Sequence, residues 1–253
     1  MKTLPCCRWI ALLATAALLA ACYPVRDTSR PPATKTLPGD RHATTLVIAL
    51  PGIADNLASL EAGGIGNAVH GAWPDADVEL VELTIGYYKD GRALPALHDL
   101  VATARREGYR HVWLAGASLG GMGALLYDTA WPDDVDGLVL LAPYLGDEAI
   151  LKDIRAAGGV VRWQAPPAAM PGPENWQAQL WRRVKAWSAR PGGDSRVWLA
   201  YGDKDKFAPN MPLLAPAVPA SHIVTGPGVH EWTTWTPLAA RVFARAPHGA
   251  ATP

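Results

Sequence analysis

Three residues of the types that together perform nucleophilic catalysis follow strand-like runs in this sequence: Ser118, Asp205 and His230. A serine hydroxyl is a weak nucleophile at neutral pH, so it needs a histidine base within hydrogen-bond reach and a carboxylate that orients the base. Ser118 stands in a G-x-S-x-G pattern over 116–120, between an apolar strand-like run and the apolar helical pattern of 122–127. The glycines leave room for the tight, strained turn that exposes such a serine. We therefore predict that Ser118 is the nucleophile.

The base and the acid are predicted from the loops that follow the last two strand-like runs. His230 lies in the Gly-rich loop after the last run, whereas we interpret the other six histidines, including His98 in an expected helix, as structural. The loop after the preceding run contains both Asp203 and Asp205. An open α/β sheet places its ligand crevice at such carboxyl ends of strands. The order Ser, Asp, His is that of a triad, and position alone leaves both aspartates open.

Six apolar runs of strand length are available to position these residues. They cover 44–50, 78–83, 111–115, 137–141, 196–201 and 221–225. Between them apolar residues recur at helical spacing, as in 94–104, where Gly108 follows the end of the pattern. Strands that alternate with helices predict a mainly parallel sheet of about six strands, with helices on both faces.

With these motifs in this order, the chain resembles the α/β-hydrolase superfamily from Thr44 to the helix after His230. The resemblance implies a three-layer α/β fold, in a minimal version that lacks the family's first two strands. In that family the acid commonly lies in a G-x-x-D-x-x-x-P turn. That turn corresponds here to Gly202 through Pro209 and selects Asp205.

The same resemblance implies an oxyanion hole made of backbone N–H groups. One is the amide of Leu119, directly after the nucleophile. The other lies in the loop after the first strand-like run, where we choose Ile53 over Gly52 and Ala54.

The first 21 residues have the pattern of a signal peptide, with a positive start and an apolar run. Their end, Leu19-Ala20-Ala21-Cys22, resembles the lipobox of bacterial lipoproteins, which implies a lipid anchor on Cys22. The protein is then expected in the bacterial cell envelope, facing the periplasm or the exterior. Tyr23, in place of an Asp, favours the outer membrane. Residues 22–43 are predicted to be a Pro-rich tether to a single α/β-hydrolase domain over 44–253.

The segment 146–190 interrupts the alternation of strands and helices. It is rich in proline and then predicts a helix around 175–187, with Trp176, Leu180, Val184 and Trp187 at helical spacing. The segment is either a cap over an acyl pocket or a helix packed against the edge of the sheet, and the sequence leaves both open.

The charge balance and the motifs limit the classes of binding partner that we expect. Lys plus Arg and Asp plus Glu each number 23, so nothing in the charge balance indicates nucleic acid. Neither metal-ligand spacing nor a phosphate-binding loop is present, so no metal and no cofactor are expected. The expected partners are a small-molecule or lipid-like ester and, through the anchor, the membrane.

The sequence therefore predicts a serine hydrolase that cleaves carboxylic esters through an acyl-enzyme intermediate. A peptidase, a thioesterase or an acyltransferase would use the same triad, because the fold and triad set acyl chemistry while the pocket selects the acyl group. A non-catalytic lipoprotein that uses the fold for binding is a third hypothesis.

Overall fold

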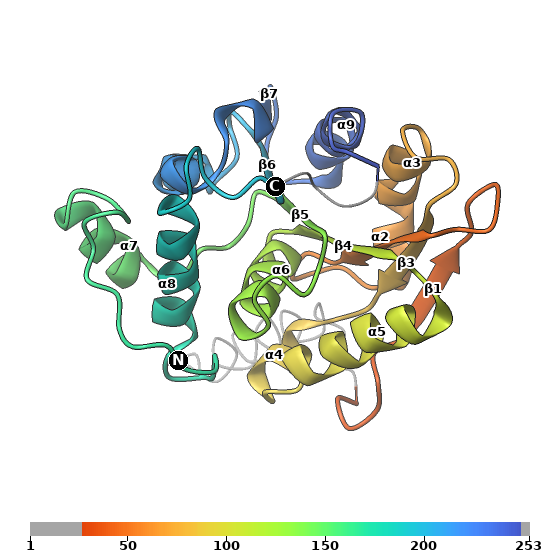
Figure 1. The fold of residues 1–253 in the computed structure, drawn as a ribbon, viewed down its shortest axis with the longest axis horizontal. Coiled ribbons are helices and arrows are strands. Elements are labelled where there is room, and N and C mark those ends of the chain that lie inside the picture. Colours follow the sequence, from red (N-terminus) through yellow and green to blue (C-terminus); the bar gives the residue numbers. More distant parts are fainter. Residues whose placement is uncertain (1–26, 249–253) are drawn as a thin grey trace, which may run out of the picture.

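The computed structural model describes residues 27–248 and contains a seven-stranded sheet between two layers of helices (Figure 1). The strand order is β1-β3-β2-β4-β5-β6-β7, and all neighbours are parallel except β1 and β3. The strands are β1 (Thr34–Leu37), β2 (Thr45–Leu50), β3 (Asp77–Val81), β4 (His111–Ala117), β5 (Gly137–Leu141), β6 (Val197–Gly202) and β7 (Ile223–Gly226). The α-helices are α2 (Leu57–Ala62), α3 (Ile65–His70), α4 (Ile85–Lys89), α5 (Ala93–Glu107), α6 (Leu119–Ala130), α7 (Glu148–Ala156), α8 (Trp176–Ser188) and α9 (Trp232–Phe243). Two 3-10 helices, Ala208–Ala217 and Ala220–His222, lie between β6 and β7.

The predicted α/β class is confirmed, and the six predicted strands correspond to β2 through β7. Side chains of β2 alternate between the two faces of the sheet. Leu46, Ile48 and Leu50 share a core with α5, α6 and α8, whereas Val47 and Ala49 share a second core with α3 and α9. Every residue of β2 is buried, which explains why its sequence after Thr45 is an unbroken apolar run.

The tether predicted for 22–43 is wrong for Thr34–Leu37, which form β1 at the edge of the sheet. β1 pairs antiparallel with β3, and the side chain of Thr36 donates a 2.6 Å hydrogen bond to Glu79. Its residues are mostly exposed, so the strand carries no apolar pattern and cannot be told from a tether by sequence. The sheet therefore begins at residue 34 rather than 44, and one strand precedes β2. The predicted signal peptide and Cys22 lie outside the described residues.

The segment 146–190 contributes both to the core and to the surface above it. Leu180, Trp181, Val184 and Trp187 of α8 are fully buried, as expected for a helix packed into the main core. The loop before α8 and its first residue, Trp176, instead line a cavity described below.

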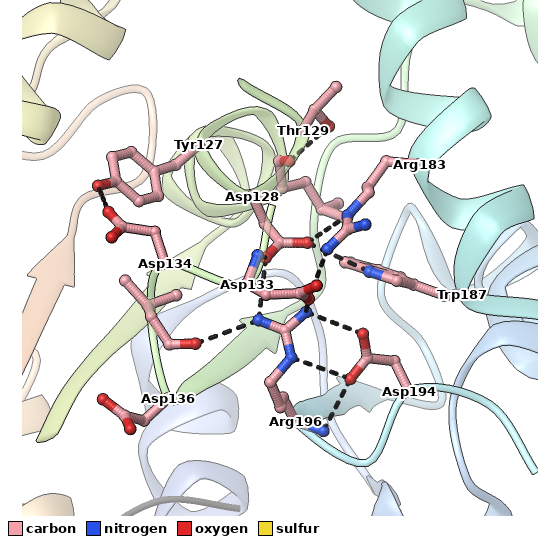
Figure 2. Close-up of polar contacts among 12 residues, drawn as sticks. Tyr127, Asp128, Thr129, Asp133, Asp134, Asp136, Arg183, Trp187, Asp194 and Arg196 are labelled. Carbon is pink, nitrogen blue, oxygen red and sulfur yellow. Dashed lines mark hydrogen bonds and ion pairs between the residues drawn. The ribbon is translucent and has the colours of Figure 1, made fainter. Parts of the chain in front are cut away.

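A buried ionic cluster joins α6, α8 and the start of β6 (Figure 2). Asp128 of α6 accepts hydrogen bonds from Arg183 of α8 at 2.6 Å and from Arg196 at 3.1 Å. Arg196 also contacts Asp194 at 2.9 Å and Asp133 at 2.7 Å. The cluster lies near the C-terminal end of α6, which leaves the N-terminal end of that helix for Ser118.

Within 27–248 no helix is long and apolar enough to cross a membrane.

Candidate active site

Ser118 occupies a strained turn between β4 and α6. Its φ is 51° and its ψ is −108°, a conformation that side-chain-bearing residues rarely adopt. A Cβ atom on Gly116 would lie 2.2 Å from the carbonyl oxygen of Gly120, and one on Gly120 would lie 2.5 Å from that of Leu50. The two glycines of the motif are therefore required by the close approach of backbones around the serine, as the sequence predicted.

The structure brings the three predicted residues into one hydrogen-bonded chain. Nε2 of His230 lies 2.9 Å from Oγ of Ser118, and Nδ1 lies 2.8 Å from both carboxylate oxygens of Asp205. A carboxylate at Nδ1 holds the proton on that nitrogen and leaves Nε2 free to accept the serine proton. The arrangement can therefore activate the hydroxyl as a nucleophile.

Asp205 is the aspartate that contacts His230, and its carboxylate is held from several sides. Burial would raise its pKa, but hydrogen bonds from His230 and from the amide of Phe207, at 2.8 Å, bring the pKa below its ordinary value. Asp203 instead accepts a 3.0 Å hydrogen bond from the amide of Gly228. It therefore connects the acid loop to the histidine loop and does not contact the base.

The loop after β2 lies beside the serine, and one aspartate holds it in place. Oδ2 of Asp55 accepts hydrogen bonds from the amide of Gly52 and from the indole of Trp232, both at 2.9 Å. The Gly52 amide is thus already used, which excludes it as an oxyanion donor. Ile53 lines the same cavity as Ser118, and its role as an oxyanion donor stays a prediction. The same is true of Leu119, whose amide at the first position of α6 lacks a partner within the helix.

The N-terminal part of α9 packs against this loop and against the base. The rings of Trp232 and Trp235 meet edge to face at 5.3 Å, and those of Trp235 and His230 do so at 4.6 Å. The indole N–H of Trp235 also lies 3.4 Å from Asp205. One helix end therefore contacts Asp205, His230 and the loop after β2 together.

Ser118 opens into an apolar cavity of about 830 Å³. Its walls come from α4, α5, α6 and the 170–176 segment, and the α6 residues among them are Leu119, Met122 and Leu126. Trp131, just past the end of α6, also lines the cavity, so the lining follows about 18 Å of helix. Such a volume and lining suit an apolar group of the size of a small-molecule ligand.

Two polar residues of this lining were not identified from the sequence as site residues. His98 lies in the wall, stacked on Trp131 with ring centroids 4.2 Å apart, where the sequence indicated only a structural histidine. Tyr88 of α4 lines the cavity as well. Neither stands near a motif, so only the packing of α4 and α5 against α6 brings them to the site.

Among the described residues no group of three or more His, Cys, Asp or Glu side chains could hold a metal ion.

Comparison with known proteins agrees with this geometry. Residues 94–244 match the esterase family described as "Putative esterase". The chain belongs to this esterase family. The match includes Ser118, Asp205 and His230, and membership makes the protein a hydrolase with the α/β-hydrolase fold. Comparison with curated proteins finds no match.

Solved structures similar to this esterase share its fold at low identity. Est1E from Butyrivibrio proteoclasticus superposes with a TM-score of 0.55 at 14% identity over 84% of this chain and 90% of its own. The S-formylglutathione hydrolase FrmB from Staphylococcus aureus has a TM-score of 0.54 at 11% identity, over 85% and 97%. The monoacylglycerol lipase of Paleococcus ferrophilus has a TM-score of 0.55 at 13% identity, over 85% and 99%. These identities support the fold and leave the substrate to be inferred from the site itself.

Proposed function

We propose that this protein hydrolyses carboxylic esters through an acyl-enzyme intermediate on Ser118. The observation that carries the proposal is the hydrogen-bonded chain from Ser118 through His230 to Asp205 at the mouth of an apolar cavity. His230 takes the proton of Ser118 as Oγ attacks the ester carbonyl, and then gives it to the leaving alcohol. A water molecule, activated by the same histidine, releases the acid.

The amides of Leu119 and Ile53 are proposed to stabilise the oxyanion. Negative charge develops on the carbonyl oxygen during attack, and preorganised N–H donors in a site shielded from water stabilise it strongly. Ser118 itself is only 6% exposed, which supports a shielded site.

The acyl group, rather than the alcohol, is proposed to fill the cavity. The acyl group stays bound to Ser118 in the intermediate, whereas the alcohol must leave toward solvent. Because most of the cavity lining is apolar, it favours the part of the substrate that remains attached.

A matched series of substrates tests the reaction type. With one acyl group presented as a 4-nitrophenyl ester, a thioester and an anilide, we expect kcat/KM to be highest for the ester. Lengthening the acyl chain should raise kcat/KM by at most about fourfold per methylene, the equivalent of about 0.8 kcal/mol, until the cavity is filled. Higher activity on the anilide or thioester would contradict ester hydrolysis, and a decline from acetate onward would contradict the acyl assignment.

Attachment to the bacterial envelope through a lipid on Cys22 is proposed as well, with the outer membrane favoured. Support comes from the lipobox-like sequence Leu19-Ala20-Ala21-Cys22. The chain that follows lies beside α4, because the carbonyl of Arg30 accepts a 3.0 Å hydrogen bond from the hydroxyl of Tyr87, and this helix also lines the cavity. Asp27 follows Cys22 by five positions in the sequence, which limits the distance between their Cα atoms to about 18 Å. A lipid anchor would thus hold the α4 side of the cavity close to the membrane, where lipid-like esters are found. Incorporation of labelled palmitate that is lost in Cys22→Ala is the expected result, and equal labelling of both proteins would contradict it.

A further inference from the structure

The cavity at Ser118 is elongated, and one helix forms a wall along its length. Leu119, Met122 and Leu126 of α6 all line it, and residues at this spacing lie on the same side of a helix. Trp131, directly after α6, lines the cavity as well. From the first to the last of these residues the helix rises by about 18 Å. The lining from α6 is therefore an apolar strip that begins beside the proposed nucleophile and extends away from it.

The far end of this strip is built from stacked rings. The ring of Trp131 stacks on that of His98 from α5, with centroids 4.2 Å apart and planes inclined by 6°. Its centroid also lies 5.0 Å from that of Tyr127. Nδ1 of His98 lies 3.2 Å from the hydroxyl of Tyr127, which donates a hydrogen bond to Asp134. These ring contacts and hydrogen bonds hold the indole of Trp131 in the cavity wall.

The charged residues of the lining come from elements other than α6. They are Lys89 of α4, Asp99 of α5 and Lys206 in the loop after β6, and all three are exposed. An exposed charge keeps its hydration, so these residues lie where the cavity meets solvent. His98, which also lines the cavity, has its ring flat against Trp131. A chain that follows α6 therefore meets apolar side chains rather than charges.

We propose that the substrates are esters of long-chain fatty acids, and that the acyl chain lies along α6 from Ser118 to Trp131. This substrate class rests on the proposed ester hydrolysis and specifies its acyl group. Carbon–carbon bonds of about 1.5 Å that meet at about 111° advance an extended chain by about 1.25 Å per atom. A wall of about 18 Å therefore accommodates about 14 carbons. Each methylene up to that length leaves water for an apolar wall, which favours long chains over short ones.

A scan of acyl length on the full-length protein tests the substrate class. The probes are 4-nitrophenyl esters of straight-chain acids with an even number of carbons from 4 to 16, each kept below its critical micelle concentration. We expect kcat/KM to rise along the series and to be highest at about 12 carbons or more. A maximum at ten carbons or fewer would overturn the substrate class while ester hydrolysis stands. If none of the esters is hydrolysed, the proposed function fails, and the substrate class fails with it.

Truncations along α6 test where the chain lies. Met122→Ala, Leu126→Ala and Trp131→Leu remove contacts at increasing distance from Ser118 along the helix. With each profile of kcat/KM normalised to the butyrate ester, the first variant should fall below the wild type at the shortest chains and the last only at the longest. Beyond its own length each loss should be at least about threefold. Losses that are equal at every length would overturn the placement, and the order of two variants decides it if the third does not fold.

Leu125→Ala is the matched control, because Leu125 is fully buried in the same core as Leu126 but does not line the cavity. Its normalised profile should coincide with that of the wild type. A second series places the long chain on the alcohol, as butyrate esters of alcohols with 4 to 16 carbons. In that series the cavity variants should show no ordered loss. The same order in the alcohol series, or a length-dependent loss in Leu125→Ala, would overturn the placement of the acyl chain along α6.

Discussion

At the scale of single residues, the site depends on a serine held in a strained turn and on two side chains from distant loops. Gly116 and Gly120 allow the strain because any Cβ atom there would collide with backbone. The Ser118–His230 and His230–Asp205 contacts are already at hydrogen-bond length. No rearrangement is needed for Nε2 of His230 to reach Oγ of Ser118.

The two neighbouring aspartates allow a matched test of the acid. Asp205→Asn should lower kcat by roughly 10³- to 10⁴-fold, because an amide cannot hold the proton on Nδ1 of His230 as a carboxylate does. Asp203→Asn should retain kcat near the wild-type value, since its amide oxygen can still accept from Gly228. Steady-state kinetics on one ester checks both. Equal losses in the two variants would show that the loop, not the carboxylate, is what matters.

The lowered pKa of Asp205 predicts a dependence of stability on pH. A carboxylate whose pKa is lower in the folded than in the unfolded protein stabilises the fold above the unfolded pKa, near 3.9, and that contribution is lost as pH falls through the folded pKa. The difference in unfolding free energy between wild type and Asp205→Asn should therefore be constant at neutral pH and shrink below about pH 4. Urea unfolding across this range measures it. A difference that grows toward acid would contradict the sign.

At the scale of elements, the start of α9 connects the two sides of the site. Asp55 joins the loop after β2 to Trp232, and Trp235 packs on His230. The position of the proposed oxyanion donor, Ile53, thus depends on a carboxylate that does not itself face the substrate.

Asp55→Ala should therefore lower kcat by roughly 10- to 100-fold with little change in KM, because misplaced donors weaken only the transition state. Asp55→Asn should recover most of the loss, since a single oxygen at the position of Oδ2 accepts both hydrogen bonds. A rise in KM at constant kcat, or no rescue by asparagine, would contradict a positioning role for this side chain.

The ionic cluster at the other end of α6 is expected to serve stability rather than chemistry. Asp128 is fully buried, so Asp128→Asn should lower the unfolding free energy by about 3 kcal/mol, because Arg183 and Arg196 each lose one of their carboxylate partners in the interior. Asp133→Asn, at the half-exposed edge of the same cluster, should cost about 1 kcal/mol or less. Denaturant unfolding compares them. Equal costs would show that burial does not set the strength of the cluster.

Much of the element structure could be predicted from sequence, and the exceptions have physical causes. Buried parallel strands such as β2 are almost entirely apolar, and Gly108 follows the end of α5 in a left-handed conformation. β1 was missed because an exposed edge strand is held by pairing and not by apolar side chains. The hydrogen-bonded group of Ser118, Asp205 and His230 could be predicted because each of these residues follows the end of a strand. Tyr88 and His98 were not, because only tertiary packing brings α4 and α5 to the cavity.

At the scale of the whole molecule, the candidate active site and the ionic cluster lie at opposite ends of α6. Ser118, Asp205 and His230 follow the carboxyl ends of β4, β6 and β7, whereas the ionic cluster lies at the opposite end of α6. The cavity runs between these ends along α6. The same helix therefore begins directly after Ser118, the proposed nucleophile, and forms a wall of the cavity.

The central claim is that Ser118 is a nucleophile activated by His230, and covalent labelling tests it most directly. After treatment with a fluorophosphonate, intact-mass and peptide analysis of the purified protein should show a single adduct on Ser118. Ser118→Ala should show none and should not cleave short-chain esters, whereas Ser221→Ala, a change at an exposed serine, should be labelled like the wild type. Equal labelling of Ser118→Ala and the wild type would contradict the account.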